Sequence, residues 1–151
     1  GDIDLLVPAD RAALAYETLR AAGFVDPAPK PFVSLPIHDL PRLSDATTGV
    51  GVELHTTVVA ARLGALLPVG WFAEGAESVS FRGGRVRVPG PTRMVAHVVV
   101  HDRLQDRGDQ LGTLRLRPLL DLAMLRHRHA AAIDWPAPRM IWSRAGSIPV
   151  R

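Results

Sequence analysis

The 151-residue sequence contains no cysteine. This absence excludes disulfides, thiolate zinc sites and cysteine nucleophiles together, so any bound metal must be held by oxygen and imidazole ligands. Lysine is almost absent too, because Lys30 is the only one and arginine supplies nearly all of the positive charge. Arginine forks match phosphate oxygens better than an ammonium group does, which favours a phosphate-bearing partner. An arginine-rich composition is also typical of a GC-rich genome, and a net charge of +3 does not by itself indicate a nucleic-acid binder.

Leader and membrane segments are missing as well. The chain begins Gly-Asp-Ile-Asp, without an initiator methionine, a basic segment or an apolar stretch of the secretory type. Its apolar runs are interrupted by charge, so no membrane span is predicted. These absences favour a cytoplasmic protein. Because Gly1 directly precedes a strand-like motif, we expect the natural protein to start earlier and this chain to be an N-terminally truncated fragment.

The composition that is present, with 47% hydrophobic and 22% charged residues, is typical of a globular protein with a real core. The hydrophobic pattern has a period of two in the first part of the chain and becomes helical after Pro89-Gly90-Pro91. The sequence therefore predicts an α+β fold, with strands and helices in residues 1–90 and a helical extension in residues 91–151.

The strongest chemical signal is a pair of aspartates at alternate positions of a short predicted strand. The apolar run Ile3–Val7, which Pro8 ends, is typical of a short strand. Asp2 and Asp4 stand two positions apart at its start, so both side chains would project from the same face. Two carboxylates so close together repel each other unless a cation lies between them. The alternative is a frayed terminus and a solvated edge strand. A helix over residues 11–22, capped by Asp10 and ended by Gly23, should follow.

A second polar strand face occurs in residues 49–59. Glu53 and His55 alternate with apolar residues there, so both side chains should share one face. If this strand lies beside the first, Glu53 completes a cluster of three carboxylates that could bind Mg²⁺, as phosphoryl and nucleotidyl transfer require. An exposed strand residue is the alternative for Glu53. For His55 the alternatives are a bond to a neighbouring side chain, orientation of Glu53, or contact with a nucleotide.

The remaining elements follow from local patterns. We expect an edge strand, a helical turn, two aromatic core residues on a loop, a hairpin and two long helices. The edge strand is expected over residues 32–38, the helical turn over residues 60–67, and the aromatic core residues are Trp71 and Phe72. The hairpin joins strands 78–81 and 85–88. The long helices are residues 92–105, capped by Thr92, and residues 111–129.

Several motifs occur in a recognisable order. They are GDIDLLV, a helix ending in Gly23-Phe24, a proline-rich stretch with His38, VELH, GRVRVP, His97 with His101, and Asp121-Leu122-Ala123. In this order they resemble the family of uncharacterised bacterial nucleotidyltransferases within the polymerase-β-like superfamily. The resemblance covers nearly the whole chain. It implies a polymerase-β-like core with a short mixed sheet and helices. It also implies that Asp2, Asp4 and Glu53 hold Mg²⁺ or Mn²⁺ and that an NTP binds through its triphosphate.

The implied reaction is metal-dependent transfer of an NMP from an NTP to a hydroxyl group. The acceptor could be a small molecule, a protein side chain or an RNA end, and neither DNA nor a membrane is expected as a partner. Members of the superfamily carry a glycine-containing helix start upstream of the aspartate strand, where backbone amides hold phosphates. Since no such segment precedes Gly1, we expect the fragment itself to bind NTP weakly or to be inactive. The alternative function is a non-catalytic nucleotide-binding or interaction module that retains the carboxylates.

Two further groups of residues carry weaker hypotheses. His97 and His101 lie four apart on a predicted helix, but the sequence between them lacks the glutamate of zinc hydrolases. We therefore expect a structural role, through packing or hydrogen bonding, or a role facing the substrate, and no zinc site. Four arginines near the second helix could hold phosphates or RNA, although a solvated helix face explains them as well. They are Arg115, Arg117, Arg126 and Arg128.

Overall fold

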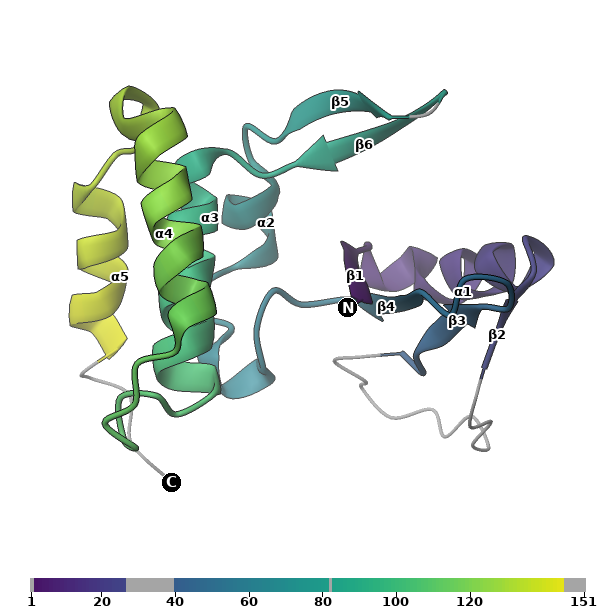
Figure 1. The fold of residues 1–151 in the computed structure, drawn as a ribbon, viewed down its shortest axis with the longest axis horizontal. Coiled ribbons are helices and arrows are strands. Elements are labelled where there is room, and N and C mark those ends of the chain that lie inside the picture. Colours follow the sequence, from purple (N-terminus) through teal and green to yellow (C-terminus); the bar gives the residue numbers. More distant parts are fainter. Residues whose placement is uncertain (1, 27–39, 82, 146–151) are drawn as a thin grey trace. The chain divides into compact units, whose positions relative to one another are not determined.

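The protein is described here by a computed structural model that covers residues 2–26, 40–81 and 83–145. The chain divides into two compact units, residues 1–58 and residues 59–151 (Figure 1). Each unit has its own buried side chains. Unit 1 is an α/β unit and unit 2 is mostly helical. The α+β class that the sequence predicts is confirmed, whereas the domain boundary after residue 90 stays a prediction.

Unit 1 is built on a four-stranded mixed sheet in the order β1-β4-β3-β2. The first strand pairs with β4 in parallel, and the other two pairs are antiparallel. The short mixed sheet that the family resemblance implies is therefore present. The elements are β1 (Asp2–Leu6), the 3-10 turn η1 (Ala9–Arg11), α1 (Ala12–Ala21), β2 (Phe24–Val25), β3 (Leu43–Asp45) and β4 (Gly51–His55).

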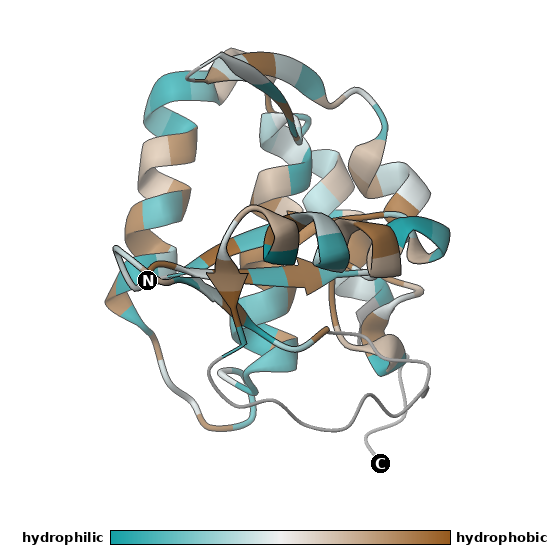
Figure 2. Cartoon of the chain, turned by 90° about the vertical axis from the view of Figure 1, so that its right-hand side faces the viewer, coloured by the Kyte–Doolittle hydropathy of each residue, from teal (hydrophilic) through white to brown (hydrophobic). Residues whose placement is uncertain are grey.

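The core of unit 1 lies between the sheet and α1. Leu43 and Leu54 are only 1% and 2% exposed, and they pack with Tyr16 of the helix. The helix shows mixed hydrophobic and hydrophilic bands, as expected of an element with one buried face (Figure 2). Because side chains alternate along a strand, the neighbours of Leu54 project from the sheet face opposite α1. That second face carries the polar residues of β1 and β4.

The start of the first helix differs from the prediction. Asp10 does not cap α1, because η1 intervenes and the Arg11 N–H donates to the Pro8 carbonyl at 2.9 Å. The predicted end is correct, since Gly23 adopts the left-handed conformation (φ 96°) that a side chain disfavours. The predicted strand over residues 32–38 lies outside the described residues.

A tight turn joins β3 to β4 and fixes their register. One carboxylate oxygen of Asp45 accepts hydrogen bonds from the Thr47 and Thr48 amides, at 3.0 and 2.6 Å, and from the Thr48 hydroxyl at 2.8 Å. Gly49 completes the turn at φ 70°. The backbone hydrogen bond from Thr48, followed by its side-chain hydrogen bond, lowers the pKa of Asp45. Ionised Asp45 therefore stabilises the turn from which β4 starts.

We expect this stabilisation to depend on pH. A carboxyl group whose pKa is lower in the folded state than in the unfolded state stabilises the fold when the pH is above its unfolded pKa, near 4. This stabilisation is lost as the pH falls through the folded pKa. Asp45→Ala should lower the melting temperature of unit 1 at pH 7, and the difference from wild type should shrink below about pH 4. Far-UV circular dichroism melts at both pH values measure this. Asp10→Ala is the control, and an equal effect of both substitutions would contradict the assignment.

Unit 2 is organised around α3, which packs against α4 and α5. Its most buried side chains come from the segment before the hairpin and from α3, and include Val59, Leu67 and Val100. The elements are η2 (Ala61–Leu63), α2 (Val69–Ala73), β5 (Glu77–Phe81), β6 (Gly84–Val88), α3 (Pro91–Val100), the π-helical turn η3 (His101–Gln105), α4 (Leu116–His129), η4 (Ala130–Ala132) and α5 (Pro136–Ala145).

The hairpin of β5 and β6 forms as predicted, with antiparallel pairing and Gly83 at φ 82° in its turn. Other predictions in unit 2 need correction. Phe72 is buried as expected, but it lies with Trp71 on α2 and not on a loop. Gly90, not Thr92, is the cap residue of α3, whose first residue is Pro91. Thr92 is buried inside the helix, and its hydroxyl contacts the segment before α5 instead.

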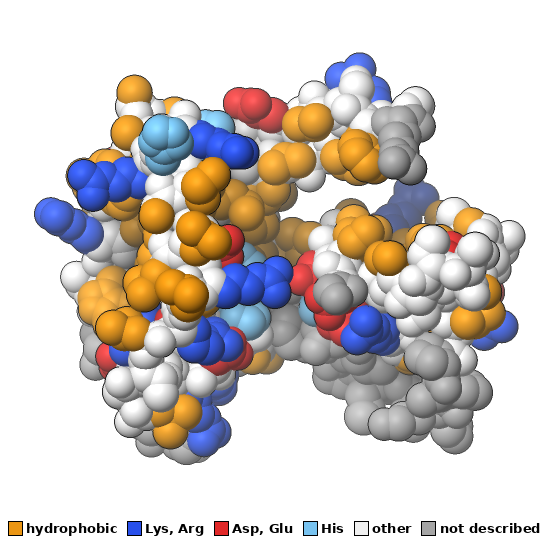
Figure 3. Space-filling view, viewed as in Figure 1, with side chains coloured by type: hydrophobic (Ala, Val, Ile, Leu, Met, Phe, Trp, Pro, Cys, Tyr) orange, Lys and Arg blue, Asp and Glu red, His pale blue; other side chains and the backbone are white. Residues whose placement is uncertain are grey.

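The α4 helix buries none of its residues fully, although much of it is apolar. Leu116, Leu120 and Met124 are 82%, 58% and 38% exposed, and hydrophobic side chains gather over this helix in the space-filling view (Figure 3). Helix α4 begins later than predicted, because Arg115 is still extended. Among the described residues no helix combines the length and the apolar character that crossing a membrane requires.

Candidate metal centre

The parallel pairing of β1 with β4 creates the candidate site. Its register sets Asp4 directly opposite Glu53, and Asp2 opposite Gly51. Residues opposite each other on neighbouring strands project from the same face of the sheet. The structure therefore brings together side chains that lie about fifty positions apart in the sequence. Acidic, basic and histidine side chains gather at one side of unit 1 (Figure 3).

Asp4, Glu53 and His55 form the tightest part of this site. Each offers a ligand atom within 4.8 Å of the others. The His55 Nε2 lies 3.1 Å from an Asp4 oxygen and 3.8 Å from a Glu53 oxygen. Among the described residues this is the one group of three or more such side chains close enough to share an ion. The Asp4 side chain is 67% exposed, so a ligand can reach the group from solvent.

Asp2 belongs to the same face but not to this tight group. Its carboxylate lies 3.9 Å from the Arg42 guanidinium, and the same nitrogen lies 4.0 Å from a Glu53 oxygen. The guanidinium thus bridges two of the three carboxylates that the sequence singles out. Metal binding by Asp2, Asp4 and Glu53 stays a prediction, but their placement on one face agrees with the period-two pattern.

Arg42 is the residue of this site that the sequence analysis missed. Arg42 immediately precedes β3. In the antiparallel β3–β4 pair, Leu43 lies opposite Val52, so the register extended by one residue places Arg42 opposite Glu53. The available signal was Gly51, because a glycine inside a strand often marks close approach of another group. A Cβ on Gly51 would lie 2.3 Å from the Arg42 Nε. The missing side chain of Gly51 is what leaves room for the guanidinium.

The donor set fits a hard divalent cation. Mg²⁺ and Mn²⁺ prefer carboxylate oxygens, and Mn²⁺ also accepts imidazole nitrogen. With bonds of about 2.1 Å, neighbouring ligands of an octahedral ion lie about 3 Å apart and opposite ligands about 4.2 Å apart. The distances among Asp4, Glu53 and His55, from 3.1 Å to 4.8 Å, need only small side-chain movements to match. The site is open enough for water and substrate oxygens to complete the shell.

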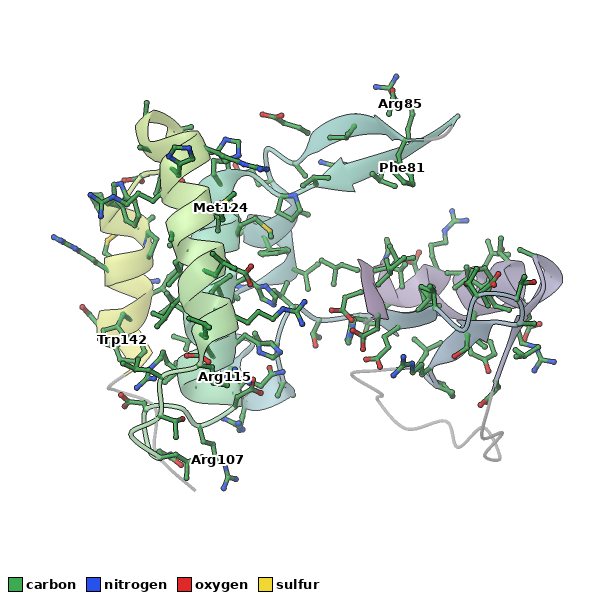
Figure 4. The ribbon with its side chains drawn as sticks, in the orientation of Figure 1. Phe81, Arg85, Arg107, Arg115, Met124 and Trp142 are labelled. Atoms are coloured by element: carbon green, nitrogen blue, oxygen red, sulfur yellow. The ribbon has the colours of Figure 1, made fainter. Side chains whose placement is uncertain are left out.

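His97, His101 and Arg115, which the sequence also singled out, have structural contacts in unit 2. The His97 ring meets the rings of Phe72 and His101 edge-on, with centroids 5.6 and 5.5 Å away. His101 lies 3.3 Å from an Asp106 oxygen. Arg115, labelled in Figure 4 just before α4, donates to buried Asp102 at 2.6 Å, and this contact with Asp102, then Asp106, raises its pKa.

Comparison with known proteins gives one family match. The model of a family described as uncharacterised nucleotidyltransferase matches residues 1–150, and so extends over both units. No curated protein and no solved structure matches the chain significantly. The match supports nucleotidyl transfer as the general reaction.

Proposed function

Because this chain belongs to the family of uncharacterised nucleotidyltransferases, we propose that it transfers an NMP from an NTP to a hydroxyl acceptor in a metal-dependent reaction on the carboxylate face of unit 1. The observation that carries the proposal is the set of Asp4, Glu53 and His55 ligand atoms within 4.8 Å of one another. Asp2 lies on the same face, two residues before Asp4. The substrates are an NTP and a hydroxyl-bearing small molecule, protein or RNA.

Each residue has a distinct part in this proposal. Asp2, Asp4 and Glu53 would hold Mg²⁺ or Mn²⁺, which on binding neutralises phosphate charge and orients the NTP. His55, 3.1 Å from Asp4, would orient that carboxylate or donate to the nucleotide. The exposure of the Asp4 side chain leaves a path for the acceptor. Catalysis at such a site is mostly positioning and charge stabilisation, so rigid placement on two paired strands suits it.

The chemical balance of the step is simple. An acceptor hydroxyl oxygen forms a bond to the α-phosphorus of the NTP, and the bond from that phosphorus to the bridging oxygen breaks. Pyrophosphate leaves with the electron pair of the broken bond. A carboxylate of the site takes the hydroxyl proton and returns it to solvent.

The test is calorimetric titration of the protein, in the form its gene encodes, with each of the four common NTPs. We expect binding that requires Mg²⁺ or Mn²⁺, because the carboxylates alone repel a triphosphate. Incubation with α-labelled NTP and pools of small molecules, proteins or RNA should then release pyrophosphate and label one class of acceptor.

Two outcomes contradict the proposal in different ways. Absence of metal-dependent NTP binding removes the nucleotide function altogether. Metal-dependent binding without pyrophosphate release from any acceptor pool favours a nucleotide-binding module that retains the carboxylates but transfers nothing.

A further inference from the structure

We propose that Arg42 is a substrate-binding residue that holds the polyphosphate chain of the nucleotide, and that Gly51 is a positioning residue that admits the Arg42 side chain to the site. The inference rests on the proposed function and extends it to two residues outside the predicted carboxylate set. It starts from the position of the guanidinium, which lies 3.9 Å from Asp2 and 4.0 Å from Glu53.

The contacts of Arg42 leave it free to change partners. Both ion pairs are at the long end of the range for charged contacts, and the side chain is 45% exposed. Exposed ion pairs of this kind stabilise a fold only slightly, so little is lost when the guanidinium turns to another anion. A metal ion on Asp2 and Glu53 would compete directly for the oxygens that Arg42 now faces. The guanidinium would then point its donors at whatever anion the metal brings.

The charge of the site indicates that this anion is a polyphosphate. Three carboxylates with one divalent cation leave a net negative charge, which opposes the approach of a triphosphate. Arg42 cancels that remaining charge, so the face becomes neutral with one metal ion and positive with two. The planar fork of arginine also matches phosphate oxygens in a two-point contact that lysine cannot form. Arg42 therefore supplies both the charge and the geometry that a polyphosphate needs beside the metal.

Gly51 makes this arrangement possible. Its position in β4 belongs to the same face as Glu53, and a Cβ there would lie 2.3 Å from Arg42 Nε and Nη2 and 2.6 Å from Cζ. These are the mobile end of a flexible side chain, so a methyl group would displace the guanidinium without unfolding the strand. Gly51→Ala thus moves the arginine from the site while leaving its charge in the protein.

The experiment measures binding of inorganic tripolyphosphate with Mn²⁺ by calorimetry, and of Mn²⁺ alone by electron paramagnetic resonance. Arg42→Gln should weaken Mn²⁺–tripolyphosphate binding about tenfold or more, or about 1.4 kcal/mol. Binding of Mn²⁺ alone should be unchanged or tighter, because a competing cation is gone. Arg42→Lys should restore part of the affinity. Arg11→Gln, another exposed arginine of unit 1, is the matched control and should have no effect.

Gly51→Ala provides the second variant, should Arg42→Gln fold poorly. It should weaken tripolyphosphate binding about as much as Arg42→Gln does, and the double variant should be no weaker than either single variant, because both remove the same contact. Unchanged tripolyphosphate affinity in Arg42→Gln, with normal binding by wild type, overturns this inference alone. Failure of wild type to bind Mn²⁺ and tripolyphosphate contradicts the proposed function itself.

Discussion

Asp4→Asn is expected to abolish metal-dependent NTP binding and to lower any transfer rate by more than about 100-fold. Even the outer partners of metal ligands typically contribute roughly 10–100-fold to metal affinity or activity, so a direct ligand should contribute more. The amide keeps the size of the carboxylate but leaves the charge of the cation uncompensated. Because Asp4 also lies 3.1 Å from His55, the substitution weakens the tightest contact of the site, since a neutral amide oxygen accepts less strongly than a carboxylate oxygen. Mn²⁺ titration and NTP calorimetry measure the loss.

Glu17→Gln is the matched control for this experiment. Glu17 is an exposed residue of α1, away from the carboxylate face, so the substitution removes one negative charge from unit 1 without touching the site. We expect both variants to melt near the wild-type temperature, since an exposed acidic cluster gains nothing in stability from its mutual repulsion. Wild-type affinity for Mn²⁺ and NTP in Asp4→Asn would show that Asp4 is not a ligand.

Leu54→Ala is expected to have the largest effect on stability. Leu54 is 2% exposed, and its truncation should cost about 3 kcal/mol through lost burial and an unfilled cavity. A unit of this size has only a small margin of stability, so unit 1 should be partly unfolded at 25 °C. Since Leu54 lies between Glu53 and His55 on β4, metal binding should be lost with the fold.

The aromatic residues allow the two units to be followed separately. All three tryptophans lie in unit 2, whereas Tyr16 lies in unit 1. In a urea titration of Leu54→Ala, the tyrosine and circular dichroism signals of unit 1 should change early and tryptophan fluorescence should change as in wild type. Leu14→Ala is the control, because Leu14 of α1 is 59% exposed and its truncation should cost little. A common shift of both signals would show that the units unfold together.

The sequence predicted well those features that depend on local alternation and on special backbone angles. The period-two pattern predicted β1 and β4 and the side on which Asp4 and Glu53 would lie, and glycines at φ 96° and 82° marked a helix end and a hairpin turn. These signals are contained in a few neighbouring residues. The sequence analysis could only assume that β1 and β4 are neighbours, because the residues near each strand do not indicate which strand it pairs with.

The features that the sequence analysis missed depend on partners far along the chain. Thr92 has the chemistry of a helix cap, but its hydroxyl is engaged by Asp134 and Ala132, about forty positions away. Similarly, α4 starts after Arg115, whose backbone is extended and whose side chain donates to Asp102, 13 positions earlier. Arg42 escaped notice for the same reason, since its contact with Glu53 requires the β3–β4 register.

The parallel pair of β1 with β4 also determines when the site can exist during folding. The contact between Asp4 and His55 closes a loop of 51 positions, whose length-dependent entropy cost is roughly 3 to 4 kcal/mol. Helix α1 and the β3–β4 turn can form earlier, because their contacts are local. A partly folded chain that contains them still has its ligands on separate segments. A nascent or damaged copy of unit 1 can thus have nearly native secondary structure and still be unable to capture an ion.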